Sequence, residues 1–192
     1  MKTSFLRVSS MLLIAGVVTM MVASCGSSKS VATKPNATKI TIPCSGPNYQ
    51  SNSKSLRFAG IGESMDLMTA KKKAMSEARA GLAAAINTTV KSVTDNYVKS
   101  GNYNNKEELM KNYEGVQREV VNQSLAGTSV ICEESFQTNQ GSFQYYVCLE
   151  LGGSEVLQTL NNKMTSNEQL KVDYNYEKFK KTFDEEMSKQ GN

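Results

Sequence analysis

A single stripe of apolar residues constrains the fold of this 192-residue chain more than any other feature. Its members recur at steps of three or four: Ala70, Ala74, Ala78, Leu82, Ile86, Val90, Val93 and Tyr97. This spacing predicts one face of an amphipathic helix of about 30 residues. Because the first three members are alanines, the beginning of this helix can lie close to the surface that it covers.

The segment before this helix predicts a short strand, LRFAGIGES, which begins at Leu56. We expect Gly60 and Gly62 to end the strand, and Ser64 to cap the start of the helix. Beyond the long helix, a second apolar stripe with a period of three to four predicts another helix, from residue 106 to about residue 125.

After Gly127 the apolar pattern changes to a period of two. The segments SVICEESFQT and SFQYYVCLEL predict a β-hairpin, with Gly141 at the left-handed position of its loop. Further helices are predicted at residues 154–164 and at about residues 174–189. The fold class is therefore α+β: a small antiparallel sheet (one strand plus a hairpin) covered by one or two long helices, with an additional C-terminal helix.

Residues 1–24 have the organisation of a secretory signal peptide. Lys2 and Arg7 give a positive start, and an apolar stretch of 13 residues runs from Met11 to Ala23. A helix that spans a membrane permanently needs about 20 such residues, so this stretch predicts a segment that is removed.

The end of the signal peptide predicts a lipid anchor. Val22, Ala23, Ser24 and Cys25 resemble the lipobox of bacterial lipoprotein precursors, in which the peptidase recognises the residues before the cysteine. The resemblance implies that Cys25 becomes the first mature residue, with a diacylglycerol on its sulfur and usually an acyl chain such as palmitate on its nitrogen. Two or three chains anchor a protein stably, so the predicted partner is a membrane bound through Cys25.

The residues after Cys25 predict the location of the anchored domain. Residue 26 is glycine, not the aspartate that resembles an inner-membrane retention signal, which favours the outer membrane. Residues 27–30 lack the acidic cluster that resembles a surface-export signal, which favours a domain facing the periplasm. A surface-exposed or vesicle-borne lipoprotein that contacts host or neighbouring cells is the alternative.

Composition divides the mature chain into three parts. Residues 25–55 comprise the lipidated cysteine and a stretch rich in Ser, Thr, Asn and Lys that holds all three prolines, which predicts a flexible tether. Residues 56–164 form the predicted α+β lipoprotein domain, and residues 165–192 a helical extension.

Three other cysteines, Cys44, Cys132 and Cys148, are available for a disulfide. In an oxidising compartment two of the three are expected to pair. If residues 138 and 142 close the hairpin turn, Cys132 and Cys148 lie opposite each other. The loop-entropy model instead favours Cys44 with Cys132 by about 1 to 2 kcal/mol, because that bond closes the longer loop. Both pairings, and three free thiols, remain open at this point.

The composition argues against an enzyme and against a nucleic-acid-binding protein. The chain has no histidine, which excludes Ser-His-Asp and Cys-His catalysis and removes the usual nitrogen ligand of zinc. The net charge is +4, and two of the basic residues lie in the predicted signal peptide, which leaves about +2, too little for a phosphate-binding surface. We expect no catalytic residues, no cofactor and no metal.

Two groups of residues are candidates for contact surfaces. Lys71, Lys72 and Lys73 lie off the apolar face of the long helix, where they are either solvated or in contact with anionic lipid headgroups. A second apolar stripe occurs in the last helix: Tyr176, Phe179, Phe183 and Met187. This stripe either packs on its own domain or docks an envelope protein or a second copy of the chain.

Several segments together resemble a known family. FAGIGES, AKKKAMSEARAGLAAAI and YYVCLEL, with the lipobox, resemble the family of the Helicobacter twenty-kilodalton outer-membrane lipoprotein, in a Bacteroidota-type member. The resemblance covers roughly residues 56–160 and implies one or two long helices on a small antiparallel sheet, as in the amino-terminal domain of a flagellar-assembly protein. The family is defined by its fold, so the resemblance implies a binding or scaffolding domain and supplies no catalytic residues.

Overall fold

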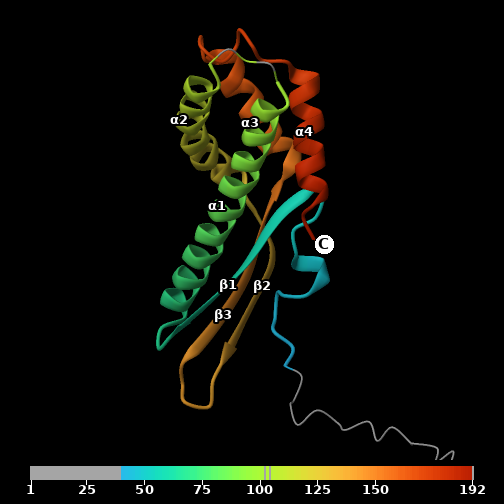
Figure 1. The fold of residues 1–192 in the computed structure, drawn as a ribbon. Coiled ribbons are helices and arrows are strands. Elements are labelled where there is room, and N and C mark those ends of the chain that lie inside the picture. The colour runs from blue at the N-terminus through green and yellow to red at the C-terminus, as the bar shows by residue number, and fades with distance from the viewer. Residues whose placement is uncertain (1–39, 102, 104, 192) are drawn as a thin grey trace, which may run out of the picture. The chain divides into compact units, whose positions relative to one another are not determined.

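A three-stranded antiparallel sheet packs against one long helix in the computed structural model, which describes residues 40–101, 103 and 105–191 (Figure 1). The strands lie in the order β1-β3-β2, so the hairpin's second strand is central and the other two strands form the edges. The sheet and its helix comprise β1 (Ser55–Ser64), α1 (Leu67–Lys99), β2 (Ser129–Gln137) and β3 (Phe143–Gly152). The predicted α+β class is confirmed.

Most of the remaining helices gather around the carboxyl-terminal half of α1, beyond the sheet (Figure 1). They are α2 (Lys106–Ser124), η2 (Leu125–Gly127), α3 (Gly153–Ser166) and α4 (Tyr176–Ser188). The short helix η1 (Pro47–Tyr49) precedes β1 in sequence and contacts that strand instead. Helix α2 packs on α1 and α3, and α4 packs on α1. None of the helices within the described ranges is both long and apolar enough to cross a membrane.

Every member of the stripe that predicted α1 is buried, with an exposed fraction of at most 1%. The helix begins two residues later than predicted, because Asp66 and not Ser64 caps it. The Asp66 carboxylate accepts hydrogen bonds from the Thr69 hydroxyl at 2.8 Å and from the Thr69 backbone N–H at 2.7 Å, and these two hydrogen bonds keep the pKa of Asp66 below its usual value. Ser64 is instead the last residue of β1.

Gly60 and Gly62 do not end β1, as the sequence predicted, but lie inside it and pair with Val147 and Tyr145 of β3. Both lie where β1 crosses the alanine part of α1. A Cβ atom on Gly62 would be 2.1 Å from the carbonyl oxygen of Ala70, and one on Gly60 would be 2.4 Å from that of Ala74. The glycines are therefore needed for close packing between strand and helix.

Aromatic side chains fill the core at the far end of α1. Tyr97 lies at the centre, with its ring centroid 5.2 Å from that of Phe179 and 6.4 Å from that of Tyr174. The Tyr97 hydroxyl accepts a hydrogen bond from the Asn175 backbone N–H at 2.8 Å and donates to the Asp173 carbonyl at 3.2 Å. These contacts attach α4 and the chain before it to α1, so residues 165–191 are part of the folded domain and not an appended extension.

The folded part of the chain also begins earlier than the predicted boundary at residue 56. Cys44 is buried and joined covalently to β2. Close to β1, the Lys54 carbonyl accepts a hydrogen bond from the Gly153 N–H at 2.8 Å. Ile40 and Ile42 remain exposed. The part of the predicted tether that lies outside the described residues is therefore 25–39, and the rest belongs to the folded unit.

Candidate functional site

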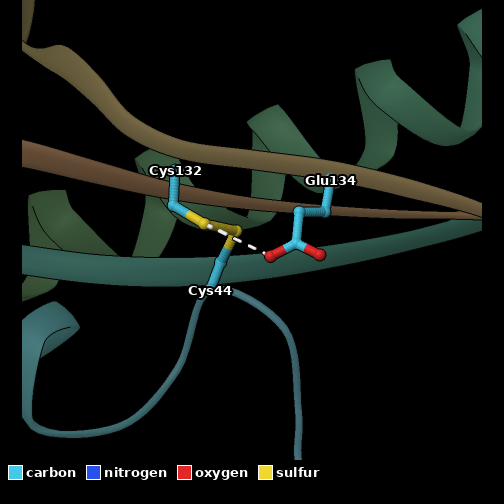
Figure 2. A group of neighbouring side chains, drawn as sticks. All are labelled: Cys44, Cys132 and Glu134. Atoms are coloured by element: carbon cyan, nitrogen blue, oxygen red, sulfur yellow. Dashed lines mark hydrogen bonds between the residues drawn. A yellow bond between two sulfur atoms is a disulfide. The ribbon is translucent and has the colours of Figure 1, made fainter.

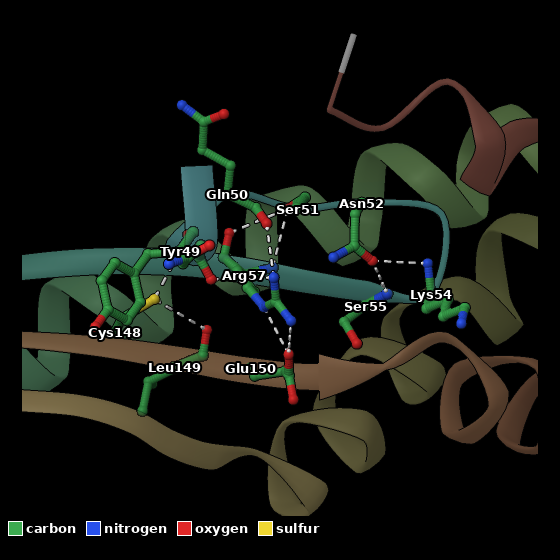
Figure 3. A network of polar contacts seen from close by, with 11 residues as sticks. Tyr49, Gln50, Ser51, Asn52, Lys54, Ser55, Arg57, Cys148, Leu149 and Glu150 are labelled. Carbon is green, nitrogen blue, oxygen red and sulfur yellow. Dashed lines mark hydrogen bonds and ion pairs between the residues drawn. The ribbon is translucent and has the colours of Figure 1, made fainter. Parts of the chain in front are cut away.

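The sheet has one face covered by α1 and an opposite face that carries most of its polar and sulfur-containing side chains. Because side chains alternate along a strand, the buried Val147 and Leu149 point towards α1, and Cys148 and Glu150 point away. Their partners across the strand pairing, Ala59 and Arg57, lie on the same opposite face. Residues 44–51 cross this face (Figure 3). We call this face of the sheet, together with residues 44–51, the sulfur face.

The disulfide of the sulfur face joins Cys44 to Cys132, which are 88 positions apart in sequence and whose Cα atoms are 5.5 Å apart. Of the two pairings that the sequence left open, the structure therefore has the one that closes the longer loop. A carboxylate oxygen of Glu134 lies 3.9 Å from the Cys132 sulfur (Figure 2). The bond fastens the chain before β1 to the edge strand β2.

Cys148 is the remaining cysteine within the described part of the chain, and it is fully buried. It pairs directly with Cys132 in the register of β2 and β3, as the turn closed by Thr138 and Ser142 predicted. Its sulfur lies 3.6 Å from the Tyr49 carbonyl oxygen (Figure 3). Burial raises the pKa of the Cys148 thiol above its usual value.

Arg57 holds residues 48–51 in place on the sulfur face. Its guanidinium binds the Glu150 carboxylate at 2.5 and 2.6 Å, and donates at 3.2 Å to the backbone carbonyls of both Asn48 and Gln50 (Figure 3). The Ser51 hydroxyl accepts a hydrogen bond from the Arg57 N–H at 2.9 Å. An arginine that directs two donors to one carboxylate oxygen and also binds two carbonyls is a strong local clamp, because charge-assisted hydrogen bonds are stronger than neutral ones.

The sulfur atoms of Cys44 and Cys132 and a carboxylate oxygen of Glu134 all lie within 4.8 Å of one another. Metals are bound by thiolates, and a sulfur in a disulfide is not a thiolate. In the oxidised protein this group is therefore a covalent cross-link. That the chain binds no metal or cofactor stays a prediction.

The three lysines of α1 have protein partners. Lys71 forms an ion pair with Glu133 of β2, and its ammonium lies 5.3 Å from the centre of the Tyr145 ring. Lys73 donates a hydrogen bond to the Glu63 carbonyl at 2.9 Å. These contacts leave less of the lysine charge for lipid headgroups than the sequence alone suggested.

Lys72 lies near Asp66, whose pKa is lowered mainly by hydrogen bonds from Thr69 and in part by the charge of Lys72. Within residues 40–101, 103 and 105–191, Lys72 makes no ion pair. Of the three lysines, it is the one best placed to contact an anionic surface. Contact between this group and lipid headgroups stays a prediction.

We expect Lys72→Ala to weaken binding of the lipid-free protein to phosphatidylglycerol vesicles about fivefold, the effect of about 1 kcal/mol for one lysine near a charged membrane. Lys71→Ala is the matched control and should have a smaller effect, because the Lys71 charge is already paired with Glu133. Vesicle co-sedimentation at low salt measures both. Binding that does not depend on anionic lipid would remove these lysines from the list of contact residues.

The apolar stripe of the last helix is part of the core. Phe179, Phe183 and Met187 are buried at 0%, 3% and 1% exposure. Tyr176 is 42% exposed. The hypothesis that this stripe is a partner face is therefore wrong for three of its four residues, which pack on their own domain because α4 lies against α1.

The predicted lipid anchor and peptidase recognition residues, Val22 to Cys25, lie outside the described residues.

We compared the chain with protein-family models, curated proteins and solved structures. None of them matches this chain.

Sequence reasoning missed the ion pair between Arg57 and Glu150. Their charges are opposite and the two residues are direct partners in the pairing of β1 with β3. Opposite charges at directly paired positions are a recognised signal for strand register. The signal was hidden because the predicted strand that contains Arg57 was not assigned a partner strand.

Proposed function

We propose that this chain is an outer-membrane lipoprotein, anchored by acyl chains on Cys25, with a non-catalytic binding or scaffolding domain that faces the periplasm. The observation that carries this proposal is the sequence Val22 to Cys25 at the end of an apolar stretch of 13 residues. A thioether-linked lipid requires a thiol at this position, and small neighbours give the peptidase access to it.

The disulfide supports the exported location. Structural disulfides persist in oxidising environments such as the bacterial periplasm and are rare in the cytosol. The bond between Cys44 and Cys132 joins positions 88 residues apart, so it constrains a large part of the chain. The sequence resemblance to the Helicobacter lipoprotein family points in the same direction.

A binding role is favoured over catalysis by the chemistry of the side chains. The chain has no histidine to act as a general base at neutral pH. A densely connected polar group around Arg57 and Glu150 is engaged in holding residues 48–51 on the sheet. Such a domain can present surfaces to a partner while its lipid keeps it at the membrane.

The anchor is tested by Cys25→Ser in the full-length chain. We expect the wild-type protein to incorporate labelled palmitate and to begin at a modified Cys25 by mass spectrometry, and we expect the variant to lose both properties. Cys148→Ser is the matched control, since it also removes a thiol but leaves the lipobox intact. The control should keep the label.

Two results would contradict the proposal: a bare thiol at Cys25 in the natural protein, or a Cys25→Ser variant that is trimmed and sediments with membranes as before. The orientation has its own test, in which protease is added to intact cells. Protection that is lost only after the outer membrane is opened supports a periplasm-facing domain. Cleavage on intact cells supports the surface-exposed alternative.

A further inference from the structure

We propose that Cys148 can replace Cys44 as the disulfide partner of Cys132, so that the fold has two disulfide states that differ in whether residues 40–47 are held on the sheet. The exchange needs no lipid, and it concerns the protein whether or not Cys25 is acylated. Its consequence for the tether rests on the proposed function.

The strand register places both partners within bonding range of Cys132. Cys44 is bonded to it now, at a Cα separation of 5.5 Å. Cys148 is its direct partner across β2 and β3. Directly opposed residues on antiparallel strands have Cα atoms about 4.5 to 5.5 Å apart, and disulfides form at about 4.4 to 6.8 Å.

The three sulfur atoms lie on the same face of the sheet and under the same segment. Opposed residues on neighbouring strands project to the same face, so Cys148 and Cys132 share the sulfur face. Residues 45–49 run from Cys44 across this face, and the Tyr49 carbonyl lies 3.6 Å from the Cys148 sulfur (Figure 3). Figure 2 shows the existing bond on this side of the strands.

The exchange is balanced without an external oxidant or reductant. The Cys148 thiol gives up its proton, and its thiolate attacks the sulfur of Cys132. A bond forms between these two sulfur atoms as the bond from Cys132 to Cys44 breaks. Cys44 leaves as a thiolate and takes up a proton, so these three cysteines hold one disulfide and one thiol before and after.

Two opposing contributions set the difference in free energy between the two states. The existing bond spans 88 positions and the alternative spans residues 132 to 148, a difference in loop length that favours the existing bond by about tenfold. Against this, Cys44 has a backbone φ of 52°, in the left-handed region that is unfavourable for residues other than glycine. Release from the cross-link lets Cys44 leave that conformation.

The exchange is slow in the closed fold because Cys148 is buried and its thiol is hard to ionise. Burial raises the pKa of Cys148, the nearby Arg57 guanidinium opposes this rise, and the Glu150 carboxylate adds to it. Glu134 of β2 lies beside the sulfur that is attacked, and its negative charge disfavours an approaching thiolate. Higher pH, or opening of residues 45–49, should therefore speed the exchange.

The contacts of Arg57 with residues 48–51 determine how much of the chain leaves the sheet when the disulfide is exchanged. Arg57 binds the carbonyls of Asn48 and Gln50 without involving any cysteine. The part freed by exchange is therefore the stretch before Asn48, including Cys44. In a lipid-anchored protein this moves the attachment point of the tether towards β1 and leaves an accessible thiol at Cys44.

The test uses the purified mature chain with its disulfide intact. Samples are incubated at pH 7 and pH 9, quenched with acid, alkylated in denaturant and digested without reduction for mass spectrometry. We expect a peptide pair joined through Cys132 and Cys148, with the alkyl group on Cys44, to form at least about twentyfold faster at pH 9. An ordinary thiol gains about 25-fold in thiolate fraction over this range, and a thiol with a raised pKa gains more. Cys148→Ser should show the original pair alone at both values.

Two results would overturn the proposal. One is a wild-type protein in which Cys148 alone is alkylated at every time point, including in mild denaturant. The other is equal formation of a pair through Cys44 and Cys148, which indicates random reshuffling in unfolded chains. Cys44→Ser gives a second measurement: treated with glutathione disulfide, the folded variant should form the pair of Cys132 with Cys148, and two thiols that stay free would also reject the exchange.

Discussion

Gly62→Ala should destabilise the domain by about 3 kcal/mol, the upper end of the ordinary range for overpacking a core. The added Cβ would lie 2.1 Å from the Ala70 carbonyl oxygen and 2.6 Å from the Ala74 backbone nitrogen. Since these atoms belong to the backbone of α1, no side-chain rotation can relieve the clash, and the helix must move away from β1. Urea denaturation followed by circular dichroism measures the change.

Gly115→Ala is the matched control, because it makes the same chemical change in an exposed part of α2. A Cβ at Gly115 would meet nothing within 4 Å. Alanine is the better helix former, so this variant should gain about 0.5 to 1 kcal/mol. If Gly62→Ala were as stable as the wild type, β1 and α1 would not pack as closely as the structure shows.

Phe179→Ala should cost about 3 to 5 kcal/mol, the usual loss for a buried phenylalanine. The Phe179 ring is fully buried and lies 5.2 Å from the Tyr97 ring and 5.4 Å from the Tyr174 ring between centroids. Its removal leaves a cavity between α4 and α1. The measurement is the free energy of unfolding at equilibrium, together with the thermal midpoint.

Tyr176→Ala provides the comparison within the same apolar stripe. Tyr176 is 42% exposed, so its removal should cost less than about 1 kcal/mol. The two variants separate the two interpretations of the stripe. A Phe179→Ala protein with unchanged stability but a lost binding partner would show that α4 is an interface and not part of the core.

The elements of the fold could be predicted because their sequence periods are long and consistent. Eight residues at steps of three or four fixed the buried face of α1, and all eight are buried. The hairpin followed from a period of two on both sides of Gly141, whose φ of 86° is the left-handed conformation that the loop requires. In both cases the pattern depends on local geometry alone.

The roles of Gly60 and Gly62 could not be predicted in the same way. Glycine is common where a strand ends, and it is also required where another backbone comes close. Only the crossing of β1 over Ala70 and Ala74 distinguishes the two uses, and a crossing is a property of the tertiary structure. The placement of α4 has the same origin, since its stripe says that the helix is amphipathic but not which surface it covers.

The cysteines show how far the candidate site could be predicted. The hairpin register correctly placed Cys132 opposite Cys148, yet the bond is made to Cys44. The direction in which residues 44–51 cross the sheet decides this, and it depends on the clamp by Arg57, which the sequence did not reveal. The strand register alone therefore predicted that Cys132 and Cys148 lie opposite each other, although no disulfide joins them in the folded chain.

The position of the cross-link on β2 determines how the domain responds to mechanical force. A force applied to the chain before residue 44 is transmitted through the disulfide to Cys132, which lies on the edge strand β2. The disulfide gives the force a covalent route that bypasses the hydrogen bonds of residues 48–54. The tension is borne first by a covalent bond and then by the ladder between β2 and β3, while β1 and its packing on α1 are shielded from it.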